Sequence, residues 1–167
     1  DWSSDVCSSD LGIPAGRRVP GNVYLLDLLA TVCDFTGVQP PSTNEGISMK
    51  PVLTGKAETL REVLYGAYSG GAKPGVRCVR RGDWKLIVYK APELNLHHTQ
   101  LFNLQQNPHE LLAEHHQPAV STLLPTPPTA QQISLADQPE YATQLQQMQQ
   151  LLKAEMQRLN DPALLEF

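Results

Sequence analysis

Histidine and glutamate side chains are the first candidates for chemistry, because imidazole and carboxylate groups bind metals and transfer protons. One stretch that we expect to be helical contains His109, Glu110, His115 and His116. A zinc-protease helix carries two histidines four residues apart, so that both rings reach one ion. Here His109 and His116 would lie about 10 Å apart along the helix axis. We therefore expect an exposed polar helix end and no metal site.

The sequence offers no nucleophile with a neighbouring base. Cys33 falls among apolar residues of a predicted helix, and Cys78 alternates with arginines in a predicted strand, so both thiols are expected to be inside and inert. His97 and His98 are adjacent, and adjacent strand residues point to opposite faces, so at most one can join a site. The chain contains no G-x-S-x-G, P-loop or glycine-rich dinucleotide motif.

Basic side chains gather in one predicted hairpin, which contains Arg77, Arg80, Arg81 and Lys85. Guanidinium groups bind sulfate or carboxylate oxygens through two parallel hydrogen bonds. Arg77 and Lys85 could therefore face an anionic ligand together. A solvated hairpin edge is the stronger expectation.

The composition indicates one domain with a core of its own. The chain has 167 residues, of which 41% are hydrophobic, and a net charge of −4. This charge argues against nucleic-acid binding, and no apolar run approaches the roughly 18 residues of a membrane span. The three cysteines are an odd number without metal-site spacing, so we expect no disulfide framework.

The opening residues, DWSSDVCSSDL, have neither a helical nor a strand period. They match the translation of a sequencing-library adapter, so we expect residues 1–11 to be a non-native, disordered leader. A leader of this kind that adjoins coding sequence implies that the natural protein continues upstream. We therefore expect the chain to be the C-terminal fragment of a longer protein.

A helix is predicted over residues 22–37. Asn22 is the expected N-cap, and Gly37 suits the left-handed position that follows a last turn. Asp27 and Asp34 are expected on its solvated face. Its apolar side consists of Leu25, Leu28, Leu29, Val32 and Phe35.

Three or four short strands follow. They are predicted in REVLYGAYS (61–69), in a hairpin over 76–90 with Gly82 in the turn, and in TQLFNL (99–104). Their connections have the length of turns, which implies an antiparallel sheet.

Two helices are predicted after the sheet. NPHELLAEHH (107–116) begins with Asn107 as cap, and Glu110 completes a capping box. A surface excursion over 118–134, with four prolines from Pro118 to Pro128, separates it from a long C-terminal helix, for which Asp137 is the expected cap. The apolar stripe of this last helix comprises Tyr141, Leu145, Met148, Leu152, Met156 and Leu159.

Four stretches together resemble, in order, the C-terminal part of the sulfatase family. VYLLDLLATVCDFTGVQPP resembles the family's "D, two hydrophobic residues, P or A, T" helix, and EGISMKPVLTGK is similar to its "G-x-S-L-x-P" loop. GVRCVRRGDWKLIVY resembles "R-x-V-R-x-G-x-W/Y-K-L-I", and TQLFNLQQNPHEL resembles "x-L-Y/F-D/N-L-x-x-D-P-x-E". Order and spacing agree from Gly12 to Glu110.

This resemblance implies that the chain is an α+β fragment of an α/β alkaline-phosphatase-like fold. Residues 12–58 would be the last helix and loop of the catalytic domain. Residues 59–167 would be the C-terminal subdomain, a small antiparallel four-stranded sheet packed by helices, including the long amphipathic one. The missing N-terminal catalytic domain is the implied partner, and the family alone implies a periplasmic or secreted location.

Sulfatases hydrolyse sulfate esters with a formylglycine, made from Cys or Ser in a C/S-x-P-x-R motif, and with a calcium held by Asp and Asn. The motif is absent from this sequence, and the family's metal ligands lie upstream. Formylglycine and calcium are therefore implied for the parent enzyme only, and the fragment alone is predicted to be inactive.

The resemblance also implies a role in substrate fit, because loops of the small sheet border the family's active-site cleft. Tyr68, Ser69, Arg77 and His98 are the candidates nearest that rim, and a sulfated saccharide is the implied substrate of the parent. The alternative is a free-standing module that pairs its last helix with a partner protein. Such a module should expose no large apolar patch on the helix over 25–35.

Overall fold

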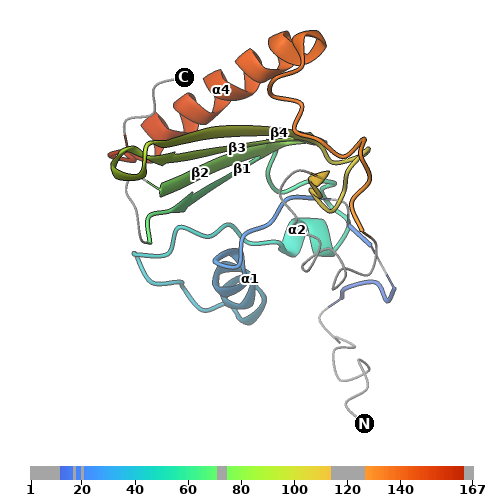
Figure 1. Cartoon of the computed structure of the whole chain (residues 1–167). Helices are drawn as coiled ribbons and strands as arrows, with labels where there is room; N and C mark the ends of the chain where they lie inside the picture. The colour runs from blue at the N-terminus through green and yellow to red at the C-terminus, as the bar shows by residue number, and fades with distance from the viewer. Residues whose placement is uncertain (1–11, 17, 20, 71–74, 114–126, 164–167) are drawn as a thin grey trace. The chain divides into compact units, whose positions relative to one another are not determined.

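The computed structural model describes residues 12–16, 18–19, 21–70, 75–113 and 127–163 (Figure 1). The chain divides into two compact units, an N-terminal unit of residues 1–64 and a C-terminal unit of residues 65–167. The expected leader lies outside the described residues, as does most of the proline-rich excursion. The predicted domain boundary after residue 58 stays a prediction.

The N-terminal unit contains helix α1 (Asp27–Thr36) and the short helix α2 (Lys50–Leu53). The prediction that Asn22 caps α1 is wrong: its side-chain amide donates to the carbonyl of Glu62 instead. The Asp27 carboxylate accepts from the backbone N–H of Tyr24 at 2.7 Å and so closes the turn before the helix. Gly37 ends α1 in the left-handed region with φ 72°, as predicted.

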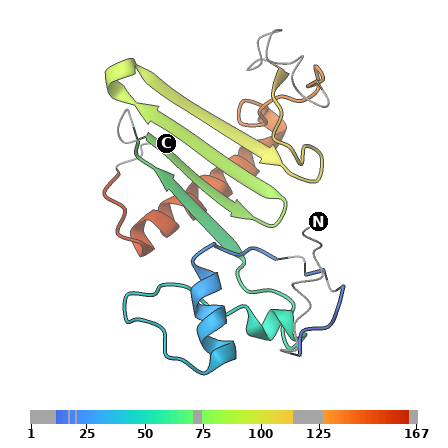
Figure 2. The ribbon, with the colours of Figure 1, turned by 90° about the horizontal axis from the view of Figure 1, so that it is seen from below.

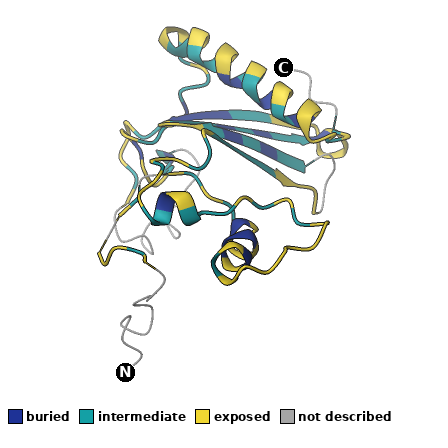
Figure 3. Cartoon of the chain, turned by 180° about the vertical axis from the view of Figure 1, so that it is seen from behind, coloured by how far each residue is buried: buried dark blue, intermediate teal, exposed yellow. Residues whose placement is uncertain are grey.

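Much of α1 is exposed, as the yellow side of this helix in Figure 3 shows, and its apolar side chains are among the exposed ones. Leu25 is 84% exposed, and Leu28, Leu29 and Val32 are each about half exposed. The buried residues of α1 are Asp27, Ala30, Thr31 and Cys33. The apolar stripe therefore exists as predicted, and most of it is exposed. Phe35 at its end is partly covered, because Lys50 Nζ lies 5.0 Å from the centre of its ring.

The four strands form one sheet in sequence order: β1 (Val63–Tyr68), β2 (Gly75–Arg81), β3 (Trp84–Ala91) and β4 (Leu96–Asn103) (Figure 2). β2 and β3 pair antiparallel, as do β3 and β4, which aligns Val79, Leu86 and Leu101 across three strands. Gly82 makes the β2–β3 turn with φ 58°, as predicted. A short 3-10 turn, η2 (Pro92–Leu94), connects β3 to β4.

Helix α4 (Ala142–Arg158) crosses one face of this sheet (Figure 1). Its predicted stripe is confirmed in the middle, where Met148 and Leu152 are fully buried, whereas Leu159 at the end is 42% exposed. The strands contribute Val79, Leu86, Val88 and Leu101 to this core, all with no exposed surface. Asp137 does not cap the helix: the 3-10 turn η4 (Pro139–Tyr141) precedes α4, and no side chain caps it.

The helix predicted over 107–116 is absent from its described part, which ends at residue 113. The Asn107 side chain instead bonds both backbone groups of Leu111, with Nδ2 donating to the carbonyl at 2.7 Å and Oδ1 accepting from the N–H. Glu110 takes a left-handed φ of 53°. A buried asparagine that pairs with the backbone in this way favours a turn over a helix.

Cys78 lies on the sheet face opposite α4 and is half-buried rather than inside as predicted. Its neighbour on β1 is Gly66, where an added Cβ would stand 2.8 Å from the Cys78 Sγ. The Cys78 Sγ therefore fills the space that a side chain at residue 66 would take.

Candidate functional site

The described residues contain no group of three His, Cys, Asp or Glu side chains that could hold a metal ion. His109 is an exposed residue of a turn, and His115 and His116 lie outside the described residues. None of the helices that the structure describes is long and apolar enough to cross a membrane. The polar clusters that the structure does show are scaffolding for the two units.

Asp27 is the centre of the N-terminal unit. The carboxylate is fully buried and accepts from Arg61 through Nη2 at 2.6 Å and Nε at 3.2 Å. It also accepts from the N–H of Ile47 at 2.9 Å. Burial opposes its ionisation, but the hydrogen bonds from Arg61, Ile47 and Tyr24 outweigh burial and lower the pKa of Asp27. The expectation of a solvated Asp27 is therefore wrong.

Two of the four stretches that resemble the sulfatase family meet around Asp27. Thr31, four residues after Asp27, donates to the Asp27 carbonyl and accepts from the N–H of Met49. An added Cβ at Gly46 would collide with the carbonyl of Leu26. The "DLLAT" helix and the "GISM" loop are therefore two halves of one polar junction.

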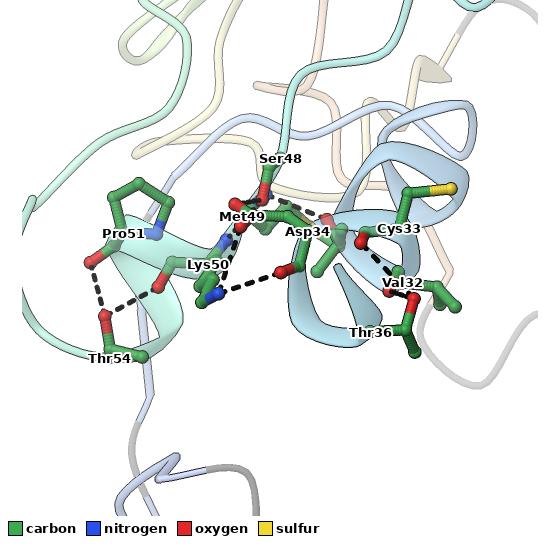
Figure 4. A network of polar contacts seen from close by, with 10 residues as sticks. Val32, Cys33, Asp34, Thr36, Ser48, Met49, Lys50, Pro51 and Thr54 are labelled. Atoms are coloured by element: carbon green, nitrogen blue, oxygen red, sulfur yellow. Dashed lines mark hydrogen bonds and ion pairs between the residues drawn. The ribbon is translucent and has the colours of Figure 1, made fainter. Parts of the chain in front are cut away.

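Asp34 lies about two turns after Asp27 on α1 and links this helix to α2 (Figure 4). Its carboxylate accepts from Ser48 Oγ at 2.6 Å and from Lys50 Nζ at 3.0 Å. These hydrogen bonds lower the pKa of Asp34, with Ser48 contributing most. Both partners are more than a third exposed, so this contact orients the helices and adds little stability.

Arg77 is buried in the C-terminal unit, with 4% of its surface exposed. It forms a bidentate ion pair with Asp161, through Nε at 2.6 Å and Nη2 at 3.0 Å. The Tyr65 hydroxyl also donates to Asp161. Tyr65, Arg77 and Asp161 come from β1, β2 and the segment after α4, and we call them the Arg77 cluster.

The ionisation of the Arg77 cluster is strongly biased. Hydrogen bonds from Arg77 lower the pKa of Asp161 to about 2, and the bond to Asp161 raises the pKa of Arg77. Burial and the bond to Asp161 both raise the pKa of Tyr65. The cluster therefore holds a carboxylate, a guanidinium and a neutral phenol throughout the physiological range.

Lys85 and Arg77 do not share an anion site, although the sequence permitted one. Arg77 on β2 pairs with Val88 on β3, and both side chains lie on the sheet face that α4 covers. Lys85 lies three residues before Val88 on β3. Because side chains alternate along a strand, Lys85 points to the opposite face. Lys85 Nζ lies 2.8 and 2.7 Å from the two carboxylate oxygens of Glu110. Glu110 thus pairs across the chain instead of completing a capping box.

The four residues predicted near a substrate lie at one end of the sheet. Tyr68 ends β1, and both it and Ser69 are exposed. An added Cβ at Gly75, the first residue of β2, would collide with the Tyr68 carbonyl. Val76, the residue after Gly75 on β2, pairs with Tyr89 on β3, and Tyr89 pairs with His98 on β4.

The structure does not gather these four side chains into one site. β1 and β4 are the two edge strands, so Tyr68 and His98 are about 14 Å apart by strand spacing alone. The His98 ring stacks at 6.2 Å from Tyr89 on the face opposite the Arg77 side chain. Their role in substrate binding stays a prediction.

Sequence reasoning missed Asp27 as a buried centre and missed Tyr65 and Asp161 altogether. Asp161 is 84 residues from Arg77 and 96 from Tyr65, so no local period relates them. One signal was present: an aspartate directly before Pro162 at the end of an amphipathic helix.

The chain belongs to the N-sulphoglucosamine sulphohydrolase, C-terminal family, whose match covers residues 11–126. It is 29% identical over 141 residues to an uncharacterized protein of Haemophilus influenzae, covering 84% of this chain and 59% of that protein. It is also 29% identical over 108 residues to arylsulfatase K of Rattus norvegicus, covering 60% of this chain and 19% of that enzyme. The chain thus spans only part of the curated relatives that it matches.

Solved structures share the fold. One is BT4656 in complex with its substrate D-glucosamine-2-N,6-O-disulfate, with a TM-score of 0.57 and 23% identity over 81% of this chain and 24% of that one. Another is the phosphonate monoester hydrolase of Silicibacter pomeroyi, with a TM-score of 0.60 and 18% identity over 88% of this chain and 27% of that one. The described residues are therefore an α+β part of an alkaline-phosphatase-like fold.

Proposed function

We propose that this chain is the C-terminal part of a sulfatase that hydrolyses sulfate esters of saccharides. The family match over residues 11–126 carries this proposal, and arylsulfatase K among the relatives supports it. The substrate of BT4656, a sulfated glucosamine, supports a saccharide as the substrate class. Within the parent enzyme, the chain borders the substrate cleft and supplies no reacting group.

The exposed face of α1 supports a missing catalytic domain. A soluble unit rarely leaves a run of apolar side chains uncovered. Here the exposed fractions of Leu25, Leu28 and Val32 are 84%, 49% and 58%. The apolar stripe of α4, by contrast, is buried on the chain's own sheet. This distribution favours a fragment over a free module that pairs through its last helix.

The family's calcium and formylglycine do not fit this chain's own residues. The described part contains no cluster of metal-binding side chains, and the sequence lacks a C/S-x-P-x-R motif. In the proposed parent, both groups belong to the upstream catalytic domain.

The test is to recover the upstream coding sequence and to express the joined protein beside the present chain. Sulfate release is measured on an aryl sulfate and on glucosamine sulfates, with a phosphonate monoester as a competing substrate because that hydrolase shares the fold. We expect release from the sulfated substrates by the joined protein and none by the chain alone. Activity of the chain alone, or a joined protein that cleaves only the phosphonate, would overturn the proposal.

A further inference from the structure

The Asp161 carboxylate has a full set of partners inside the protein. Arg77 donates two hydrogen bonds to it, Tyr65 donates one, and the N–H of Ala163 donates another at 2.8 Å. Two carboxylate oxygens offer about four acceptor positions. Asp161 therefore ties the segment after α4 to both β1 and β2.

Arg77 is equally committed. Its Nε and Nη2 donate to Asp161, and its Nη1 donates to the carbonyls of Val76 at 3.1 Å and Tyr68 at 3.5 Å. All three guanidinium nitrogens are thus engaged, and the side chain is only 5% exposed. A substrate sulfate would reach this group only by displacing Asp161.

The carbonyl that receives the last of these bonds ends β1. It is held between Arg77 Nη1 and the α-carbon of Gly75, whose φ of 87° and lack of a Cβ permit the close approach. The Tyr68 side chain itself is 66% exposed. The backbone at this point is therefore fixed from inside while the side chain is presented to the outside.

We propose that Arg77 and Asp161 are positioning residues, which fix the end of β1 so that Tyr68 and Ser69 contact the saccharide part of the substrate. The segment after α4 holds Asp161, Asp161 holds Arg77, and Arg77 holds the Tyr68 carbonyl. This inference rests on the proposed function for the identity of the ligand. The geometry of the cluster is independent of it.

Hydrogen–deuterium exchange of the whole chain tests the positioning step. Asp161→Asn removes the charge and keeps the shape, and Tyr65→Phe is a milder second variant that removes one hydrogen bond. Arg158→Gln is the matched control, because it removes an exposed ion pair with Glu155 at the end of the same helix. We expect exchange of amides 65–70 to rise about tenfold in Asp161→Asn, by less in Tyr65→Phe, and not in the control.

If exchange at 65–70 rises no more than exchange over β2, β3 and β4 in both cluster variants, the inference is overturned, because the cluster would then have only a general role in stability. So would unchanged exchange at 65–70. If Asp161→Asn fails to fold, Tyr65→Phe decides by the same two criteria.

Kinetics of the joined protein test the substrate step. We expect Asp161→Asn to raise KM for a sulfated saccharide about tenfold with kcat nearly unchanged, and to leave KM for a small aryl sulfate unchanged. A loss of kcat on both substrates would overturn the positioning role. If the unmutated joined protein releases no sulfate, the proposed function fails, whereas the exchange result still decides whether the cluster fixes β1.

Discussion

Helices α1 and α4 have the same kind of amphipathic sequence and opposite surroundings. α4 buries Met148 and Leu152 completely on the sheet, whereas α1 buries Asp27 and Ala30 and leaves Leu28 and Val32 about half exposed. An apolar stripe indicates that a helix has a partner. It does not indicate whether that partner belongs to the same chain. The C-terminal unit therefore completes its own apolar core, whereas the N-terminal unit does not.

The two units are alike in their ion pairs. Each contains one buried carboxylate held bidentately by an arginine, Asp27 with Arg61 and Asp161 with Arg77. Each pair connects the end of a helix to a distant segment. The polar junctions are thus complete in both units, although the apolar packing is complete in only one.

The largest expected effect is the loss of one member of a buried pair. Asp161→Ala leaves Arg77 buried without its partner, which should cost about 3–5 kcal/mol of unfolding free energy. Asp27→Ala should cost a similar amount, but in the N-terminal unit. Urea unfolding combined with exchange of peptides from each unit measures both. If either variant loosens the two units equally, the division into separate units is wrong.

Core truncation should separate the two helices. Leu152→Ala removes a fully buried side chain from α4 and should cost about 2–5 kcal/mol. Leu25→Ala, at a site that is 84% exposed, should change the unfolding free energy by about 0.5 kcal/mol or less. Urea midpoints measure the difference. Equal losses at the two sites would mean that the α1 face is covered in the chain as it stands.

Lowering the pH should weaken the Arg77 cluster over a defined pH range. Asp161 has a pKa of about 2 in the folded protein against an ordinary value of 3.8. Its contribution is therefore fully present above the ordinary value and is lost as pH falls towards 2. Unfolding free energies measured from pH 5 to pH 2 should fall less steeply in Asp161→Asn than in the unmutated chain. Parallel curves would contradict the assignment.

The smallest effect is expected at Lys85 and Glu110, whose side chains are 24% and 29% exposed. Lys85→Met keeps the apolar stem and removes the charge, so it should cost about 1 kcal/mol or less. Glu110→Gln should give a similar value, and the double variant should cost no more than either single one. Additive losses would show that the two residues stabilise the chain separately.

Local patterns predicted the strands, the Gly82 turn, Gly37 and the body of α4, because each depends on near neighbours or on one repeating period. They failed at helix starts. Asn22, Asn107 and Asp137 are all good caps by residue type. Asn22 instead bonds the distant carbonyl of Glu62, Asn107 closes a turn with Leu111, and a 3-10 turn follows Asp137. Competition from tertiary contacts is invisible to a local rule.

The candidate site was harder to predict for the same reason. Arg77 was selected because an arginine can bind an anion, and the anion beside it is Asp161 of the same chain. Arg77 and Lys85 were grouped because both are basic. The pairing of β2 with β3 and the alternation of side chains along each strand place them on opposite faces of the sheet. The resemblance of four ordered motifs identified the family correctly, because motifs of this kind preserve whole junctions such as that of Asp27, Thr31 and the loop.

The fit between Gly66 and Cys78 gives chemical access to the edge strand without any mutation. Burial raises the pKa of the Cys78 thiol, so alkylation should be slow at neutral pH and faster in mild base. An attached group would have to fit beside Gly66, because the Cys78 Sγ already fills the space that a side chain at residue 66 would take. Thiol reagents of graded size would therefore measure how much room the contact between β1 and β2 leaves, with covalent occupancy as the readout.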